Sequence, residues 1–216
     1  MGATGTERRR APWLGRAFQY LTMGAMLLQA ALAHPAQAGV ADERGANELS
    51  LWGGGSVAAT TMIGKSTGFD FGLAAVRYGR RLWTNDTLSF DWTVDAIPLA
   101  FLSLDRSPGG SSGDRDSVYG AGLAPLGFRF DYEGLRWVRP YFAANGGFLY
   151  FTERVPARGV KFNFTYDFGL GAQLPMGADK AITLGYSYFH ISNAGLGKSN
   201  PGFDANLLYL GFSLFR

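Results

Sequence analysis

The sequence predicts an all-β protein, an eight-stranded antiparallel transmembrane β-barrel of the outer membrane. Three observations support this fold class: an N-terminal export signal, a period-two hydrophobic alternation along the rest of the chain, and connections that alternate between long and short. No segment after the first 38 residues shows a convincing helical period.

The first 38 residues predict a cleaved signal peptide. A basic stretch ending at Arg16 precedes an apolar stretch from Ala17 to Ala33 and the small-x-small site Ala36-Gln37-Ala38. A transmembrane helix is the alternative, but two glutamines interrupt the apolar stretch and it is shorter than the roughly 20 residues that a span requires. We therefore expect cleavage after Ala38 and one β-barrel domain over residues 39–216.

Charge and composition argue against a nucleic-acid partner and against a metal site. The predicted leader holds four of the 20 basic residues and one of the 17 acidic residues, so the mature chain has 16 of each and no basic excess for phosphate backbones. The absence of cysteine excludes disulfides and thiolate ligands. Since His34 belongs to the leader, His190 is the only histidine of the mature chain, and no metal or cofactor is expected.

Period-two alternation of apolar and polar residues predicts where the strands lie. It is clearest from Lys161 to Leu174, where a run of aromatic and aliphatic residues from Phe162 to Ala172 faces one side and small or polar residues face the other. Several predicted strands exceed ten residues, which suits tilted membrane strands. The predicted strands are 47–56, 68–82, 87–103, 117–131, 135–151, 160–174, 180–192 and 203–215.

The connections between these strands alternate in length. The long ones are 57–67, 104–116, 152–159 and 193–202, and the short ones are 84–86, 132–134 and 175–179. Short periplasmic turns and long outer loops are typical of outer-membrane barrels, and an even strand number puts both termini on the periplasmic side. A soluble barrel such as a lipocalin is the alternative, but an interior of about eight strands has limited room for so many inward rings.

Charged residues fall into two groups. The larger group is expected to pair inside the lumen: Asp91, Asp95, Asp167, Lys161, Arg129 and Arg139. The smaller group lies on predicted outer loops, where it could meet lipid phosphates or be simply solvated: Lys65, Arg106 and Lys198.

The end of the seventh predicted strand carries the candidate chemistry. His190 and Ser192 are two residues apart, so they share the lipid-facing side, with Cα atoms about 7 Å apart. Asp204 begins the last strand at the same rim and on the same side. The convergence indicates an acid–histidine–serine hydrolytic set. Polar side chains that merely sit at the headgroup level are the alternative.

The segment His190-x-Ser192-Asn193-Ala194, followed by Asn200-Pro201-Gly202, resembles the active-site motif of the PagL-type lipid A 3-O-deacylases. That family consists of outer-membrane eight-stranded barrels, and the resemblance implies hydrolysis of the ester-linked acyl chain at position 3 of lipid A. It implies Ser192 as nucleophile, His190 as base and Asp204 as the orienting acid. The close match covers about 15 residues. Family members with demonstrated activity have glutamate where this sequence has Asp204.

A lipid A esterase needs donors for its oxyanion, and Asn193 and the backbone N–H of Gly195 are the candidates, with Asn200 as a further oxyanion or substrate contact. The expected partner is lipid A or lipopolysaccharide in the outer leaflet, and a homodimer is left open. Two other functions stay open: a non-catalytic adhesin or structural barrel that interacts through 104–116, and a lipid A palmitoyltransferase, which uses a similar barrel but lacks this motif.

Overall fold

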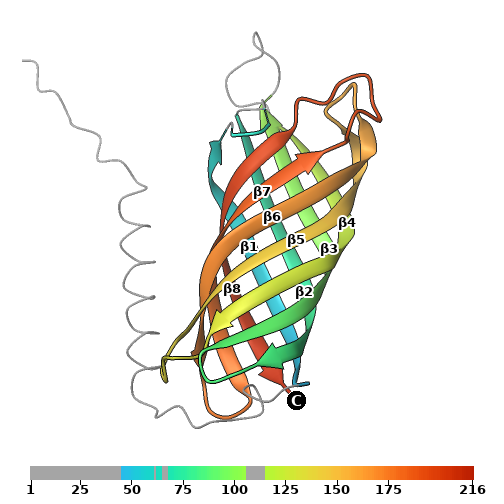
Figure 1. Cartoon of the computed structure of the whole chain (residues 1–216). Helices are drawn as coiled ribbons and strands as arrows, with labels where there is room; N and C mark the ends of the chain where they lie inside the picture. Colours follow the sequence, from blue (N-terminus) through green and yellow to red (C-terminus); the bar gives the residue numbers. More distant parts are fainter. Residues whose placement is uncertain (1–44, 61, 65–67, 106–114) are drawn as a thin grey trace, which may run out of the picture.

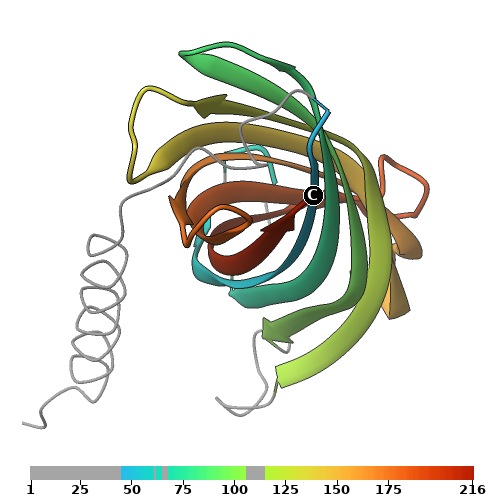
Figure 2. The ribbon, with the colours of Figure 1, turned by 90° about the horizontal axis from the view of Figure 1, so that it is seen from below.

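The computed structural model describes residues 45–60, 62–64, 68–105 and 115–216, so the predicted signal peptide lies outside the described residues. Eight antiparallel strands follow one another around a closed barrel, and β1 pairs with β8 to complete the ring (Figures 1 and 2). The predicted eight-stranded antiparallel barrel is confirmed. The strands are β1 (Asn47–Thr60), β2 (Phe69–Thr84), β3 (Leu88–Asp105), β4 (Arg115–Tyr132), β5 (Arg139–Val155), β6 (Val160–Pro175), β7 (Lys180–Ser192) and β8 (Phe203–Phe215).

The outer wall of the barrel is apolar. Large hydrophobic side chains point outward at alternate positions, and Leu51, Leu126 and Leu170 are each more than 60% exposed. On a soluble barrel these side chains would face inward, because exposed apolar surface on this scale is unfavourable in water. The observed polarity is that of a membrane barrel, so the lipocalin alternative is wrong.

Paired charges fill the lumen at the end where the described chain begins and ends. The fully buried Arg129 guanidinium lies 2.6 Å from a carboxylate oxygen of Glu48, 2.6 Å from one of Asp91 and 3.0 Å from one of Asp131. Buried charges are tolerated when they are paired in this way. The predicted luminal pairing is confirmed for Asp91 and Arg129, and likewise for Asp95 with Arg77 and Arg139 with Glu133. Asp167 instead accepts hydrogen bonds from Asn145 and Ser187.

Lys161 is a correction to the luminal assignment. Its side chain is exposed and lines a groove on the outer loops. Lys161 is the second residue of β6, directly after the β5–β6 turn, so its side chain lies at the rim of the barrel and reaches solvent instead of the closed lumen.

The opposite half of the lumen is filled by apolar side chains, among them Phe71, Leu102 and Phe151. The β1–β2, β3–β4 and β7–β8 connections, of eight to ten residues each, leave from this end, whereas the predicted long connection 152–159 is only a four-residue turn between Val155 and Val160. The ends of the described chain meet at the other end, where Asn47 and Arg216 exchange backbone hydrogen bonds of 2.7 and 2.8 Å. Figure 1 shows the β5–β6 hairpin and the β7–β8 loop close together at the long-loop end. No helix in the described part of the chain is long and apolar enough to cross a membrane.

Candidate functional site

The acid and the histidine of the predicted site face each other across two strands. His190 on β7 is the direct register partner of Asp204 on β8, on the outward side at the long-loop end. Directly opposed residues have Cβ atoms about 5 Å apart, a span that short side chains can bridge. The His190 Nδ1–Asp204 Oδ1 distance is 2.5 Å, and the carboxylate is fully buried although it lies on the outer wall.

The loop after β1 covers this carboxylate. The backbone N–H groups of Ile63 and Gly64 both donate hydrogen bonds of 2.7 Å to Asp204 Oδ2. A Cβ at position 64 would lie 2.8 Å from Asp204 Oδ1 and 2.8 Å from the carbonyl carbon of Gly202, so the close approach requires glycine. The two N–H groups compensate the burial of the charge and fix the carboxylate opposite His190.

The imidazole is held on its other sides by a ring and a loop. Tyr166 on β6 is the register partner of His190, and the two ring centroids are 4.8 Å apart. A Cβ at Gly202 would lie 3.0 Å from His190 Cε1 and 3.7 Å from Nε2. With Nδ1 bound to the carboxylate, the tautomer assigned from this geometry carries its proton on Nδ1 and leaves Nε2 as the basic atom.

Ser192 is bound by the β7–β8 loop. Its Oγ lies 3.1 Å from Asn200 Oδ1 and 3.0 Å from Asn200 Nδ2, and it accepts the backbone N–H of Ala194 at 3.1 Å. Among the residues that the structure describes, these are the hydrogen-bond partners of the hydroxyl, and His190 is not one of them. The structure therefore pairs the histidine with the acid and the serine with an amide, on one face of β7.

A tight turn aims the Ala194 N–H at Ser192. Ala194 has φ 51° and Gly195 has φ 82°, and Leu196 N donates to Asn193 O at 3.0 Å. Two successive residues with positive φ define a type I′ turn. Alanine in this region costs on the order of 1 kcal/mol, and such strain is concentrated at functional sites.

The two predicted oxyanion donors are used by the loop itself. Gly195 N–H donates to Asn193 Oδ1 at 3.0 Å, and Asn193 Nδ2 donates to the Ser199 carbonyl at 2.8 Å. Asn193 is 1% exposed, so its amide has no free access to a substrate. The arrangement gives both residues a part in shaping the loop, and their oxyanion role stays a prediction.

The family model described as lipid A 3-O-deacylase (PagL) matches residues 66–213. This match covers more than half of the chain and includes β7, the β7–β8 loop and most of β8. The chain belongs to the PagL family.

One solved structure of the same family agrees with this assignment at the level of the fold. The crystal structure of the outer membrane enzyme PagL has a TM-score of 0.50 and 20% identity, covering 76% of this chain and 97% of that chain. Neisserial surface protein A has a TM-score of 0.45 and 13% identity, covering 78% of this chain and 96% of that chain. OprG from Pseudomonas aeruginosa has a TM-score of 0.47 and 10% identity, covering 81% of this chain and 97% of that chain. The comparison with curated proteins gave no match. The predicted outer-membrane barrel of the PagL family is confirmed.

Within this PagL-family barrel, sequence reasoning missed the residues that hold the site together. Ile63 and Gly64 act through backbone N–H groups, which carry no side-chain signal in a sequence. Tyr166 was placed on the lipid face with other rings, and only the register of β6 with β7 shows that it stacks on His190. The positive φ of Ala194 also had no sequence signal, because alanine rarely adopts it.

Proposed function

We propose that this protein hydrolyses the ester-linked acyl chain at position 3 of lipid A, with Ser192 as nucleophile, His190 as base and Asp204 as the acid that orients it. The observation that carries the proposal is the buried His190–Asp204 pair at 2.5 Å beside Ser192, on the lipid-facing wall at the outer rim. An imidazole and a carboxylate on a lipid-facing wall are costly and are kept where they serve a function.

The first step forms an acyl-enzyme. Ser192 Oγ attacks the ester carbonyl carbon while His190 Nε2 takes the hydroxyl proton, and Asp204 stabilises the imidazolium. The tetrahedral intermediate collapses, the bond to the sugar oxygen breaks, and His190 returns the proton to that oxygen. Water then attacks the acyl-enzyme with His190 again as base, which releases the fatty acid and restores Ser192.

Two hydrogen-bond donors lie next to Ser192 Oγ, and turning of this side chain would leave them free for the oxyanion. Asn200 Nδ2 and Ala194 N–H are 3.0 and 3.1 Å from Ser192 Oγ, and both point at the atom that becomes bonded to the carbonyl carbon. Donors fixed in place before the reaction stabilise a developing oxyanion without reorganisation. This supports Asn200 as the side-chain donor and Ala194 as the backbone donor.

Ser192 must turn before it reacts. In this structure its hydroxyl is bonded to Asn200 rather than to His190. Catalytic hydrogen bonds are often absent before substrate binds and form in the complex. Rotation of Ser192 Oγ toward His190 Nε2 would free Asn200 Nδ2 for the oxyanion, so one side-chain movement would assemble both elements of the mechanism.

The test uses purified, folded protein and lipid A in mixed detergent micelles, with the released fatty acid measured by mass spectrometry. Ser192→Ala and His190→Ala are each expected to abolish release. Ser199→Ala is expected to retain the native rate, because the Ser199 hydroxyl has no hydrogen-bond partner among the described residues and only its backbone carbonyl accepts from Asn193. Folding of every variant is checked by its heat-modifiable gel mobility. Native release rates in His190→Ala would reject the mechanism.

A further inference from the structure

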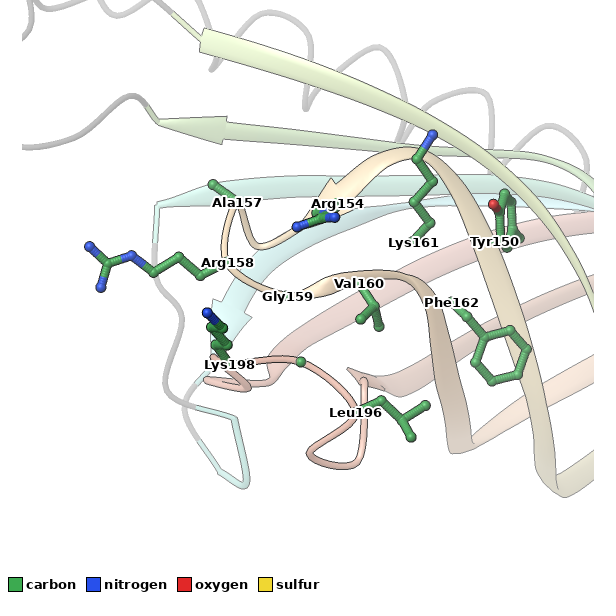
Figure 3. A pocket seen from close by; sticks show the side chains of 11 residues that line it. Tyr150, Arg154, Ala157, Arg158, Gly159, Val160, Lys161, Phe162, Leu196 and Lys198 are labelled. Atoms are coloured by element: carbon green, nitrogen blue, oxygen red, sulfur yellow. The ribbon is translucent and has the colours of Figure 1, made fainter.

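A groove lies on the outer loops beside the site. The tip of the β5–β6 hairpin and the β7–β8 loop enclose a hollow of about 660 Å³ (Figure 3), a volume in the range of ligand-binding pockets. Four cations line it, and the remaining lining residues include no acid. The cations are Arg154, Arg158, Lys161 and Lys198.

These four cations differ from the arginines inside the barrel. The luminal guanidiniums of Arg77 and Arg129 are buried and bound to carboxylates. By contrast, Arg154, Arg158, Lys161 and Lys198 form no ion pair with any residue in the described ranges. Like charges gathered without counter-charges repel one another, so the groove is arranged to accept an anion.

The groove also has an apolar floor that continues toward Ser192. Phe162, Val160 and Leu196 lie along it (Figure 3), and Leu196 is 61% exposed. Phe164, two residues further along β6 and on the same face as Phe162, is the register partner of Ser192. Two residues along a strand span about 7 Å, so the cations and the nucleophile are close enough for one lipid to contact both.

The two loops that form the groove touch backbone to backbone. A Cβ at Gly197 would lie 2.7 Å from the Cα of Gly159 and 3.3 Å from Asn193 Nδ2. This contact joins the cationic hairpin to the loop that holds Ser192. A ligand bound between these two loops would therefore be held at a fixed distance from Ser192.

We propose that this groove is the subsite for a phosphate of the lipid substrate. A phosphorylated glycolipid fits, because the cations would bind its phosphate, Phe162 and Leu196 would contact an acyl chain, and the ester would lie at Ser192. Arginine and lysine are the usual phosphate ligands of proteins. The inference rests on the proposed function, since it takes the bound lipid to be the one that Ser192 cleaves.

The test measures binding and catalysis separately. Native protein and Arg158→Gln/Lys198→Gln are titrated calorimetrically in detergent with bisphosphorylated lipid A and with the same lipid after removal of its phosphates. Deacylation of both lipids is then followed by mass spectrometry. The control double variant, Arg136→Gln/Lys180→Gln, removes two exposed cations at the opposite end of the barrel.

The groove variant is expected to bind the phosphorylated lipid at least tenfold more weakly, about 1.4 kcal/mol, and to bind the dephosphorylated lipid as the native protein does. The difference should shrink at high salt, because exposed charges are screened. The control variant should match the native protein. Equal weakening for both lipids, or no weakening, would overturn the subsite. Phosphate-dependent binding without any released fatty acid would reject the proposed function and leave the subsite standing.

Discussion

At the scale of the residue, the exchange of the family's glutamate for Asp204 is matched by its surroundings. Asp204 lies directly opposite His190, so the shorter side chain reaches Nδ1 without any movement of the strands. The N–H groups of Ile63 and Gly64 close over the other carboxylate oxygen, each at 2.7 Å. The length of the Asp204 side chain therefore matches both the position of His190 and the position of the loop that contains Gly64.

This fit predicts that glutamate does not improve the enzyme. In Asp204→Glu the carboxylate moves outward by about 1.5 Å, one C–C bond, and meets Gly64. We expect at least a tenfold lower kcat/KM for lipid A, about 1.4 kcal/mol of transition-state stabilisation. Asp204→Asn should lose at least as much, because the amide cannot support the imidazolium.

Asp179→Asn is the matched control, since this aspartate is exposed in the β6–β7 turn and far from His190. Both Asp204 variants should still fold to the heat-modifiable barrel. An Asp204→Glu rate at or above the native rate would mean that the loop adapts and that the fit described above is wrong.

At the scale of the element, the site depends on loops that meet at glycines. The β1–β2 loop contacts the β7–β8 loop where Gly64 approaches Gly202, and the β5–β6 hairpin contacts it where Gly159 approaches Gly197. Each contact brings backbone against backbone and cannot accommodate a side chain. Three outer loops therefore act together in positioning His190, Ser192 and their partners.

One added methyl group at position 64 should disturb this loop packing and leave the assembly of the barrel unchanged. Gly64→Ala places a Cβ 2.8 Å from Asp204 Oδ1 and from backbone, so the loop must move away from the carboxylate. We expect at least a tenfold loss of deacylation rate with unchanged assembly. Gly146→Ala is the control, because its added Cβ would meet nothing closer than 3.9 Å. Equal rates in the two variants would show that the loop does not position Asp204.

The strands could be predicted from the sequence, whereas these loop contacts could not. Period-two alternation between a lipid face and a lumen is a strong local signal, so all eight predicted strands overlap the observed ones. The convergence of His190 and Asp204 followed from strand parity and loop lengths alone. The hydrogen bond from Ser192 to Asn200 and the N–H groups over Asp204 depend on loop conformation, and the exposure of Lys161 depends on where the β5–β6 turn ends; alternation encodes neither.

At the scale of the whole molecule, the barrel has an apolar outer wall and a partly charged lumen, the reverse of a soluble protein. The two ends of the barrel also differ from each other. Ion pairs close the lumen near the termini, apolar side chains fill it near the long loops, and exposed leucines and phenylalanines cover the wall. Three connections of eight to ten residues leave one end of the barrel, and in outer-membrane barrels the end with the long loops is the outer one. In this orientation we expect the proposed site and the cationic groove to face the outer leaflet.

Labelling of intact cells tests this orientation, and the absence of cysteine from the chain makes single-cysteine variants unambiguous. Arg158→Cys in the β5–β6 loop should react with a membrane-impermeant maleimide, and Asp179→Cys in the β6–β7 turn should react only after the outer membrane is permeabilised. Both positions are exposed in the structure. The reverse pattern would place the site on the periplasmic side.

The most direct test of the central claim is mass spectrometry of lipid A extracted from Gram-negative cells that express the native chain or Ser192→Ala. The proposed deacylation predicts that cells with the native chain contain lipid A lacking the acyl chain at position 3, with that sugar hydroxyl free, and that cells with Ser192→Ala at equal barrel abundance contain only the fully acylated lipid. Identical lipid A from the two strains, or loss of the chain in both, would contradict the account.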